Sequence, residues 1–278
     1  MAEERIPLIE TVDLKKYFKV GDKSFLHAVD GINMKVYAGE TIGVVGESGC
    51  GKSTLGRTIL RLIEPTSGQI LYNGDDITKY NTRQMKKMRQ ELQIIFQDPY
   101  ASLDPRKSVI EIIAEYMIIN KTLPKKREIF NRAAHLMDVV GLARRYATAY
   151  PHELDGGRRQ RIGIARALSV NPKFIVCDEP VSALDVSIQA QILNLLMDLQ
   201  DDMGLTYMFV THDLSVVKHI SDNIMVMYLG QCLELTSSDE LFAKPVHPYT
   251  QALLSAIPEP DISMRNKEIK VIKGEVVS

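Results

Sequence analysis

Apolar and polar residues alternate in two stretches near the N-terminus, residues 7–14 (PLIETVDL) and 25–37 (FLHAVDGINMKVY). Alternation with a period of two is typical of half-buried strands, so both stretches are predicted to form early antiparallel strands. A short β-branched run at residues 40–46 predicts a buried strand, and the spacing of apolar positions becomes helical from residue 52. Residues 67–77 predict another strand and a turn.

The second half of the chain changes its pattern twice. From about residue 106 to residue 168 the spacing is mostly helical, which predicts an inserted helical lobe. Strand patterns then alternate with helical ones. The strands are expected at 173–178, 205–213 and 223–230, and the helices at 187–204 and 214–221. Such alternation predicts an α/β fold with a parallel sheet and helices on both of its faces.

The composition is that of an ordinary globular protein, with 45% hydrophobic and 25% charged residues among 278. A net charge of −1 gives no general attraction to nucleic acid, so no nucleic-acid partner is expected. Three widely spaced cysteines favour a reducing compartment over a disulfide framework or a zinc site. The N-terminus lacks a signal-peptide core, and no apolar run approaches the ~18 residues that span a bilayer.

Residues 46–53 (GESGCGKS) match the pattern G-x-x-x-x-G-K-[ST], with a predicted strand before them and a predicted helix after them. Glycines in such a loop aim backbone N–H groups at one point, and the helix N-terminus adds partial positive charge. We expect Lys52 to reach the β- and γ-phosphates and Ser53 to ligate Mg²⁺. The predicted nucleotide-binding residues of the loop are Gly46, Glu47, Ser48, Gly49, Cys50, Gly51, Lys52, Ser53 and Thr54.

Cys50 lies in this loop beside Lys52 and a helix N-terminus, and both features lower a thiol pKa. Alkylation of Cys50 is therefore expected to block nucleotide binding, with ATP protecting the thiol. The alternative is that Cys50 is a small buried filler.

Acidic residues end the predicted strand FIVCD, which places Asp178 and Glu179 where the ligands of parallel sheets bind. We expect Asp178 to hold Mg²⁺ and Glu179 to orient or deprotonate the attacking water. His212 closes another predicted strand, where it could contact a γ-phosphate. Gln97 follows the short apolar run IIF, and its amide could reach Mg²⁺ or the water.

Taken together, these residues resemble the nucleotide-binding subunit of an ABC transporter. The motifs occur in the family's order: the phosphate loop, the Gln97 loop, the signature at 154–158, the acidic strand end, the D-loop with Ser182 and Asp185, and the switch residue His212. The resemblance implies a P-loop NTPase fold with a RecA-like core, an N-terminal antiparallel β region and an inserted helical subdomain. It also implies ATP and Mg²⁺ as cofactors.

The resemblance further implies a single nucleotide-binding domain over 1–278. Its expected parts are a catalytic core at 1–105 and 170–240, a helical subdomain at 106–169 and a C-terminal extension at 241–278. By position, Phe18 or the neighbouring Tyr17 looks like the aromatic residue that stacks on adenine. Ordinary core packing of Phe18 is the alternative.

Two segments, QDPYASLDPR (97–106) and PVHPYTQALLSAIPEPD (245–261), look like the oligopeptide, dipeptide and nickel import branch. This branch implies a second ABC ATPase, two permease subunits and an external substrate-binding protein, with the ATPases on the cytoplasmic face of the membrane. The chain looks like the F-type ATPase of such systems. Relatives continue into a cysteine-containing segment beyond the position of Ser278. The sequence leaves open whether the transported substrate is a peptide, nickel or another small solute. A role as a soluble scaffold without transport is the other alternative.

The signature departs from the family pattern LSGGQ, because Asp155 and Arg158 flank the two glycines Gly156 and Gly157. Asp is a good helix N-cap, and residues three apart on a helix can form an ion pair. In this family the signature faces the nucleotide of the partner subunit, where a carboxylate would repel a γ-phosphate by about 4 kcal/mol at 4 Å and an effective dielectric constant of about 20. We therefore expect a heterodimer in which the ATP site facing this signature is degenerate.

Overall fold

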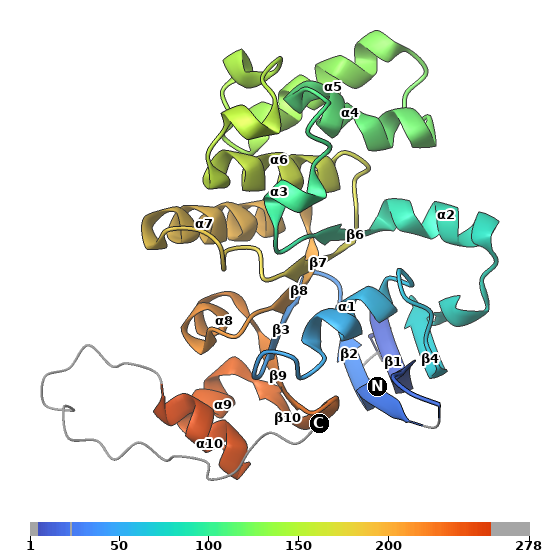
Figure 1. Cartoon of the computed structure of the whole chain (residues 1–278), viewed down its shortest axis with the longest axis vertical. Helices are drawn as coiled ribbons and strands as arrows, with labels where there is room; N and C mark the ends of the chain where they lie inside the picture. Colours follow the sequence, from blue (N-terminus) through green and yellow to red (C-terminus); the bar gives the residue numbers. More distant parts are fainter. Residues whose placement is uncertain (1–4, 23, 257–278) are drawn as a thin grey trace, which may run out of the picture. The chain divides into compact units, whose positions relative to one another are not determined.

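The computed structural model describes residues 5–22 and 24–256 (Figure 1). The chain divides into two units. The first combines the described residues up to Lys79 with those from Met208 onward, and the second is Tyr80–Tyr207. This division follows compactness alone, and the domain boundaries expected from the family remain a prediction.

The first unit contains most of the strands. Its elements are β1 (Ile9–Lys19), β2 (Phe25–Val36), β3 (Thr41–Val45), β4 (Ser67–Tyr72), β5 (Asp75–Asp76), β9 (Asn223–Tyr228), β10 (Gln231–Ser237), α1 (Lys52–Ile59), α8 (Leu214–Ile220), α9 (Ser238–Ala243), α10 (Pro248–Ser255) and a 3-10 turn at Ile77–Lys79. Strand β8 (Thr206–Val210) crosses the boundary between the units.

An antiparallel sheet with the order β2-β1-β4-β5 begins the first unit, which confirms the predicted N-terminal β region. Its strands bury alternate apolar side chains such as Ile9, Leu14 and Ile32. The pairing of β1 with β2 shifts register between Thr11 and Leu14, where Asp13 has a φ of 46°. This irregularity is a β-bulge, which bends the strand and increases its twist.

The strands β10, β9, β3 and β8 are hydrogen-bonded neighbours in that order. β3 pairs with β9 in parallel, whereas β10 pairs with β9 antiparallel. Every residue of β3 is buried, as is every residue of β8. Such continuous burial is typical of parallel strands that are covered on both faces. The predicted α/β class is confirmed.

The second unit is mainly helical. Its elements are β6 (Leu92–Ile95), β7 (Phe174–Asp178), α2 (Thr82–Glu91), α3 (Pro99–Ser102), α4 (Val109–Asn120), α5 (Lys126–Val139), α6 (Gly156–Leu168), α7 (Val186–Met203) and 3-10 turns at Arg144–Tyr146 and Pro151–Glu153. β6 and β7 form a parallel pair. Helices α4, α5 and α6, green to yellow-green in Figure 1, pack on one another and form the predicted helical lobe.

Several elements were not predicted from the sequence, among them α2, β10, α9 and α10. α2 is strongly polar and buries Met85 and Met88, and its N-terminus carries a capping box between Asn81 and Gln84. An N-x-x-Q spacing is a helix-start signal that the periodicity of apolar residues alone does not reveal. The other three, β10, α9 and α10, lie in the C-terminal part of the first unit.

None of the helices in the described part of the chain is both long and apolar enough to cross a membrane.

Candidate active site

The glycine-rich loop lies between the C-terminal end of β3 and the start of α1 in the first unit. Gly46 has a φ of 147°, and a Cβ atom there would lie 2.2 Å from the carbonyl oxygen of Met227. Gly51 has a φ of 108°, and its Cβ atom would lie 1.9 Å from the carbonyl oxygen of Ala28. Both positions therefore require glycine, for conformation and for space. The loop lies directly against the backbone of neighbouring strands.

Lys52 is the first residue of α1, and its side chain folds back over the loop. Its ammonium donates to the carbonyl oxygens of Gly46 at 2.7 Å and Glu47 at 2.8 Å, and it lies 3.8 Å from the Cys50 sulfur. Only 4% of Lys52 is exposed. The loop thus surrounds a buried positive charge at a helix N-terminus, which is an arrangement that attracts an anion.

Asp178 and Glu179 lie at the C-terminal end of β7 in the second unit. Asp178 is fully buried, whereas Glu179 is the next residue and has a left-handed backbone with a φ of 47°. Non-glycine residues adopt this conformation at a cost of about 1–3 kcal/mol and are concentrated at functional sites. The Glu179 carboxylate accepts a hydrogen bond of 2.8 Å from the Gln97 amide. Two predicted site residues 82 positions apart are therefore in direct contact.

The D-loop is a compact turn that begins at Glu179. The carbonyl oxygen of Glu179 accepts from the Ser182 hydroxyl at 3.1 Å and from the Ser182 N–H at 3.3 Å. The Gln189 amide of α7 donates to the carbonyl oxygens of Val181 and Leu184. Asp185 occupies the N-cap position of α7 without a side-chain cap. The two predicted D-loop residues, Ser182 and Asp185, are both exposed.

The altered signature forms the N-terminus of α6. Asp155 is the N-cap, and its Oδ1 accepts from the Arg158 N–H at 2.8 Å, while its Oδ2 forms an ion pair with the Arg158 guanidinium. The guanidinium also lies over the Tyr146 ring at 5.0 Å from the centroid. The cap and the ion pair predicted for Asp155 and Arg158 are confirmed. Asp155 is exposed and Arg158 is partly exposed, so solvent screens the pair and it adds little to stability.

The signature glycines allow a close approach within the second unit. A Cβ atom on Gly156 would lie 3.0 Å from Leu184 of the D-loop, and one on Gly157 would lie 2.7 Å from Ile188 of α7. The signature and the D-loop are thus packed against each other.

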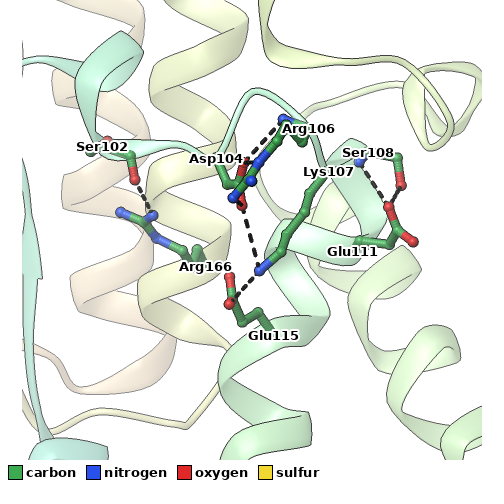
Figure 2. A network of polar contacts seen from close by, with 8 residues as sticks. All are labelled: Ser102, Asp104, Arg106, Lys107, Ser108, Glu111, Glu115 and Arg166. Carbon is green, nitrogen blue, oxygen red and sulfur yellow. Dashed lines mark hydrogen bonds and ion pairs between the residues drawn. The ribbon is translucent and has the colours of Figure 1, made fainter.

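A hydrogen bond links the segment after Gln97 to the signature helix α6, and an ion pair links it to α4 (Figure 2). Arg166 of α6 donates to the carbonyl oxygen of Ser102 at 2.6 Å. Lys107 bridges Glu115 at 2.5 Å and Asp104 at 3.9 Å. Arg166 is almost fully buried, so this link is shielded from solvent. A displacement of the segment after Gln97 would therefore reach the helix that carries the signature.

Comparison with known proteins identifies the family to which this chain belongs. Residues 29–182, more than half of the chain, match the family model described as ABC transporter. The chain belongs to the ABC transporter ATPase family. Residues 233–278 also match the model described as the oligopeptide/dipeptide transporter C-terminal region. This ABC subunit hydrolyses ATP.

Individual relatives cover almost the whole chain. The oligopeptide transport ATP-binding protein OppF of Bacillus subtilis is 52% identical over 264 residues, which are 95% of this chain and 86% of that protein. The dipeptide transport ATP-binding protein DppF of Escherichia coli is 48% identical over 277 residues, 98% of this chain and 82% of that protein. The predicted recognition of the peptide-transporter branch is confirmed.

A solved structure confirms the P-loop NTPase fold. The dimeric post-hydrolysis state of the ATP-binding cassette MJ0796, bound to ADP and Pi, superposes with a TM-score of 0.76 at 28% identity. The match covers 83% of this chain and 98% of that one.

The lowered thiol pKa expected for Cys50 in this ABC subunit is wrong, whereas the effect of its alkylation on nucleotide binding stays a prediction. Cys50 is 5% exposed, and burial raises its thiol pKa despite the opposing effect of Lys52. A thiol with a raised pKa carries little thiolate and reacts slowly. The structure therefore supports the alternative, that Cys50 is a buried filler.

The other predicted residues of the first unit have more open surroundings. Ser48, Gly49 and His212 are exposed, and Ser53 and Thr54 are partly exposed. His212 follows β8 and lies just before Asp213, the N-cap of α8.

The two candidate aromatic residues on β1 differ in their contacts. The Tyr17 ring stacks on His27 with centroids 3.9 Å apart, and its hydroxyl bonds to Asp30. The Phe18 ring instead has the Lys16 ammonium 4.9 Å from its centroid. Both rings therefore have a partner over one face, and Phe18 as the residue that stacks on a base stays a prediction.

One contact to the phosphate loop was missed by the sequence reasoning. The N–H of Glu47 donates to the hydroxyl of Tyr249 on α10 at 3.1 Å. The sequence segment HPYT was interpreted only as a feature of the transporter branch. It also combines a helix start at Pro248 with a hydroxyl-bearing aromatic residue. A partly polar aromatic side chain that is buried usually finds a hydrogen-bond partner, and this signal points to a role for Tyr249.

Proposed function

We propose that this ABC ATPase energises the import of oligopeptides or dipeptides. It does so with a second ABC ATPase, two permease subunits and an external binding protein, at the cytoplasmic face of the membrane. The observation that carries this proposal is the match of residues 233–278 to the oligopeptide/dipeptide transporter C-terminal region. The names of the relatives, oligopeptide and dipeptide transport ATP-binding proteins, support it.

The nucleotide site of this proposal assigns a role to each of the predicted residues. The backbone N–H groups of Gly46–Thr54 and the Lys52 ammonium bind the phosphates, and Phe18 stacks on adenine. Glu179 orients or deprotonates the attacking water, and His212 contacts the γ-phosphate. The Gln97 amide, which bonds to Glu179 at 2.8 Å, competes with that water for the carboxylate. Release of this hydrogen bond is therefore a step toward hydrolysis.

The donor set fits Mg²⁺ in the way that nucleotide-dependent enzymes bind it. Ser53, Gln97 and Asp178 would hold the ion through oxygen atoms, which are the ligands that Mg²⁺ prefers. The described residues contain no group of three or more His, Cys, Asp or Glu side chains able to hold a metal. A single carboxylate is sufficient where substrate phosphates complete the coordination, and the ion neutralises phosphate charge there.

The signature supports an asymmetric pair of ATP sites. In a head-to-tail dimer, Asp155, Gly156, Gly157 and Arg158 would face the nucleotide on the partner's phosphate loop. The Asp155 carboxylate replaces a neutral hydroxyl there and is held beside Arg158, which offsets part of its charge. That site is the degenerate one. The site built on Lys52, Asp178 and Glu179 receives the partner's signature and is the hydrolytic one.

The test is reconstitution in liposomes of this chain with the ATPase and permeases encoded beside it. ATP hydrolysis is measured with the external binding protein loaded either with short peptides or with nickel. We expect peptide-loaded protein to stimulate hydrolysis, and a complex carrying Lys52→Ala to show no such stimulation. Stimulation of hydrolysis by the nickel-loaded binding protein alone would indicate that the complex imports metal ions. Failure of the chain to copurify with the permeases would indicate a role outside transport.

A further inference from the structure

We propose that Tyr249 is a positioning residue for the phosphate loop, and that its hydroxyl holds the Gly46–Glu47 peptide in the conformation that receives nucleotide phosphates. The inference rests on the proposed nucleotide site at residues 46–54. It assigns a role in nucleotide binding to the C-terminal region, which has no residue in the phosphate-loop motif.

The contact is buried and well supported. The Tyr249 hydroxyl accepts from the Glu47 N–H at 3.1 Å, and only 5% of Tyr249 is exposed. Its ring packs against Tyr228 of β9, with centroids 4.7 Å apart and ring planes tilted by 52°. Burial raises the pKa of Tyr249 to about 12, so the hydroxyl is neutral throughout the physiological range. The hydroxyl is therefore a fixed, uncharged partner for the loop.

Tyr249 binds the same peptide unit that the catalytic lysine binds. The carbonyl oxygen of Gly46 accepts from the Lys52 ammonium, and the N–H of the same peptide donates to Tyr249. Behind this peptide, Gly46 lies against the carbonyl oxygen of Met227, so the loop has no room to move toward β9. The peptide is thus held from two sides, by β9 and by α10.

A chain of hydrogen bonds anchors α10 itself. Glu234 of β10 accepts from the Val246 N–H at 3.0 Å and from the His247 N–H at 3.1 Å. The His247 side chain then caps α10 by accepting from the Tyr249 N–H at 3.1 Å. Because these bonds fix the start of α10, the Tyr249 hydroxyl has little freedom to follow a displaced loop.

The consequence concerns binding more than chemistry. When phosphates bind, Lys52 must exchange its loop carbonyl partners for phosphate oxygens. A loop that keeps its shape during this exchange loses less conformational entropy on binding, which is the general advantage of preorganisation. Removal of the hydroxyl should therefore weaken ATP and ADP alike, while the hydrolytic step of bound ATP changes little.

The test compares Tyr249→Phe with the control Tyr228→Phe in the full chain. Both variants keep their rings and remove one hydroxyl from the same ring pair, but only the first removes the contact with the loop. We expect Tyr249→Phe to raise the Kd for ATP and for ADP about three- to tenfold, the equivalent of one neutral hydrogen bond. We expect kcat in the assembled complex to stay within about twofold, and Tyr228→Phe to resemble the wild type.

An unchanged nucleotide affinity in Tyr249→Phe would overturn the proposal. An equal loss of affinity in both variants, together with a lowered Tm, would also overturn it, because the packing of the two rings would then be responsible. The proposed site is tested separately by the wild type and Lys52→Ala. If the wild-type chain binds no ATP, the proposed nucleotide site is rejected, and the role of Tyr249 is rejected with it. If the wild type binds ATP and the Tyr249→Phe variant binds it with equal affinity, only the role of Tyr249 is rejected.

Discussion

The phosphate loop and the signature are both glycine-rich turns that open a helix, yet they are held in different ways. The loop at Gly46–Lys52 is fixed by groups distant in sequence, among them the Tyr249 hydroxyl and the carbonyl oxygen of Met227. The polar groups of the signature are satisfied within one helical turn, because Asp155 bonds both to the backbone and to the side chain of Arg158. The loop is therefore built into its own unit, whereas the charged side chains of the signature remain at the surface.

This difference explains which region tolerates change. A substitution in the loop disturbs contacts with β2, β9 and α10, and it also changes a group that is proposed to bind phosphate. The pair at Asp155 and Arg158 replaces the family's neutral residues without disturbing the helix, because Asp caps helices as well as Ser does. The signature has altered its chemistry while retaining its structure.

The largest effect should come from Glu179→Gln, compared with the same substitution at the corresponding glutamate of the partner ATPase. Loss of a general base lowers rates by about 10²–10⁴-fold. We expect this loss for Glu179→Gln in the reconstituted complex, because Glu179 is the proposed base of the proposed hydrolytic site. The partner's variant should retain at least half of the activity. Equal losses in steady-state ATP hydrolysis would contradict the asymmetric assignment.

The two glycine turns should also differ in stability. Gly51→Ala places a Cβ atom 1.9 Å from a backbone oxygen at a φ of 108°, and it should lower the free energy of unfolding by about 3 kcal/mol and abolish ATP binding. Gly157→Ala meets side chains and no backbone atom, with Ile188 Cγ2 at 2.7 Å and Asp155 Oδ1 at 3.6 Å, and alanine favours a helix over glycine by up to about 1 kcal/mol. Its net change should stay within about 1 kcal/mol. Urea unfolding of both variants measures the difference, and comparable losses would show that the signature is as constrained as the loop.

Restoring the family's signature should have a smaller effect. The double substitution Asp155→Ser with Arg158→Gln removes the carboxylate that, in the proposed dimer, faces the partner's nucleotide. We expect ATP hydrolysis by the complex to rise about twofold or more, because a second site becomes competent, with a Tm near that of the wild type. Asp138→Ser with Arg144→Gln removes another exposed ion pair of the same unit and serves as the control. If the restored signature lowers hydrolysis, the charged pair is part of a working site.

Much of this molecule could be predicted from the sequence, because its signals are local. The strand–loop–helix context identified the phosphate loop, and the spacing of Asp155 and Arg158 predicted their cap and ion pair. The raised pKa of Cys50 could not be predicted, since it depends on how deeply the packed loop buries the thiol. Helix α2 was missed because it buries only Met85 and Met88. The contact between Glu47 and Tyr249 joins residues 202 positions apart, and no local pattern indicates it.

The smallest effect concerns Glu234, which holds the segment that leads to Tyr249. Burial raises the pKa of a carboxyl group, but the Thr250 hydroxyl and the N–H groups of Val246 and His247 together outweigh this and lower the pKa of Glu234 below its ordinary value. A lowered pKa in the folded state means that Glu234 stabilises the protein above the ordinary carboxyl pKa and that this stability is lost as the pH falls below about 4. Glu234→Gln should therefore lower Tm by about 1–3 °C at pH 7, from one weakened hydrogen bond, and by less at pH 4. Glu128→Gln on the surface of α5, where the ion pair with Lys125 is 3.9 Å long, is the control and should leave Tm unchanged. A Tm difference for Glu234→Gln that grows toward acid pH would show that the carboxylate destabilises the start of α10. The anchoring of α10 would then depend on His247 alone.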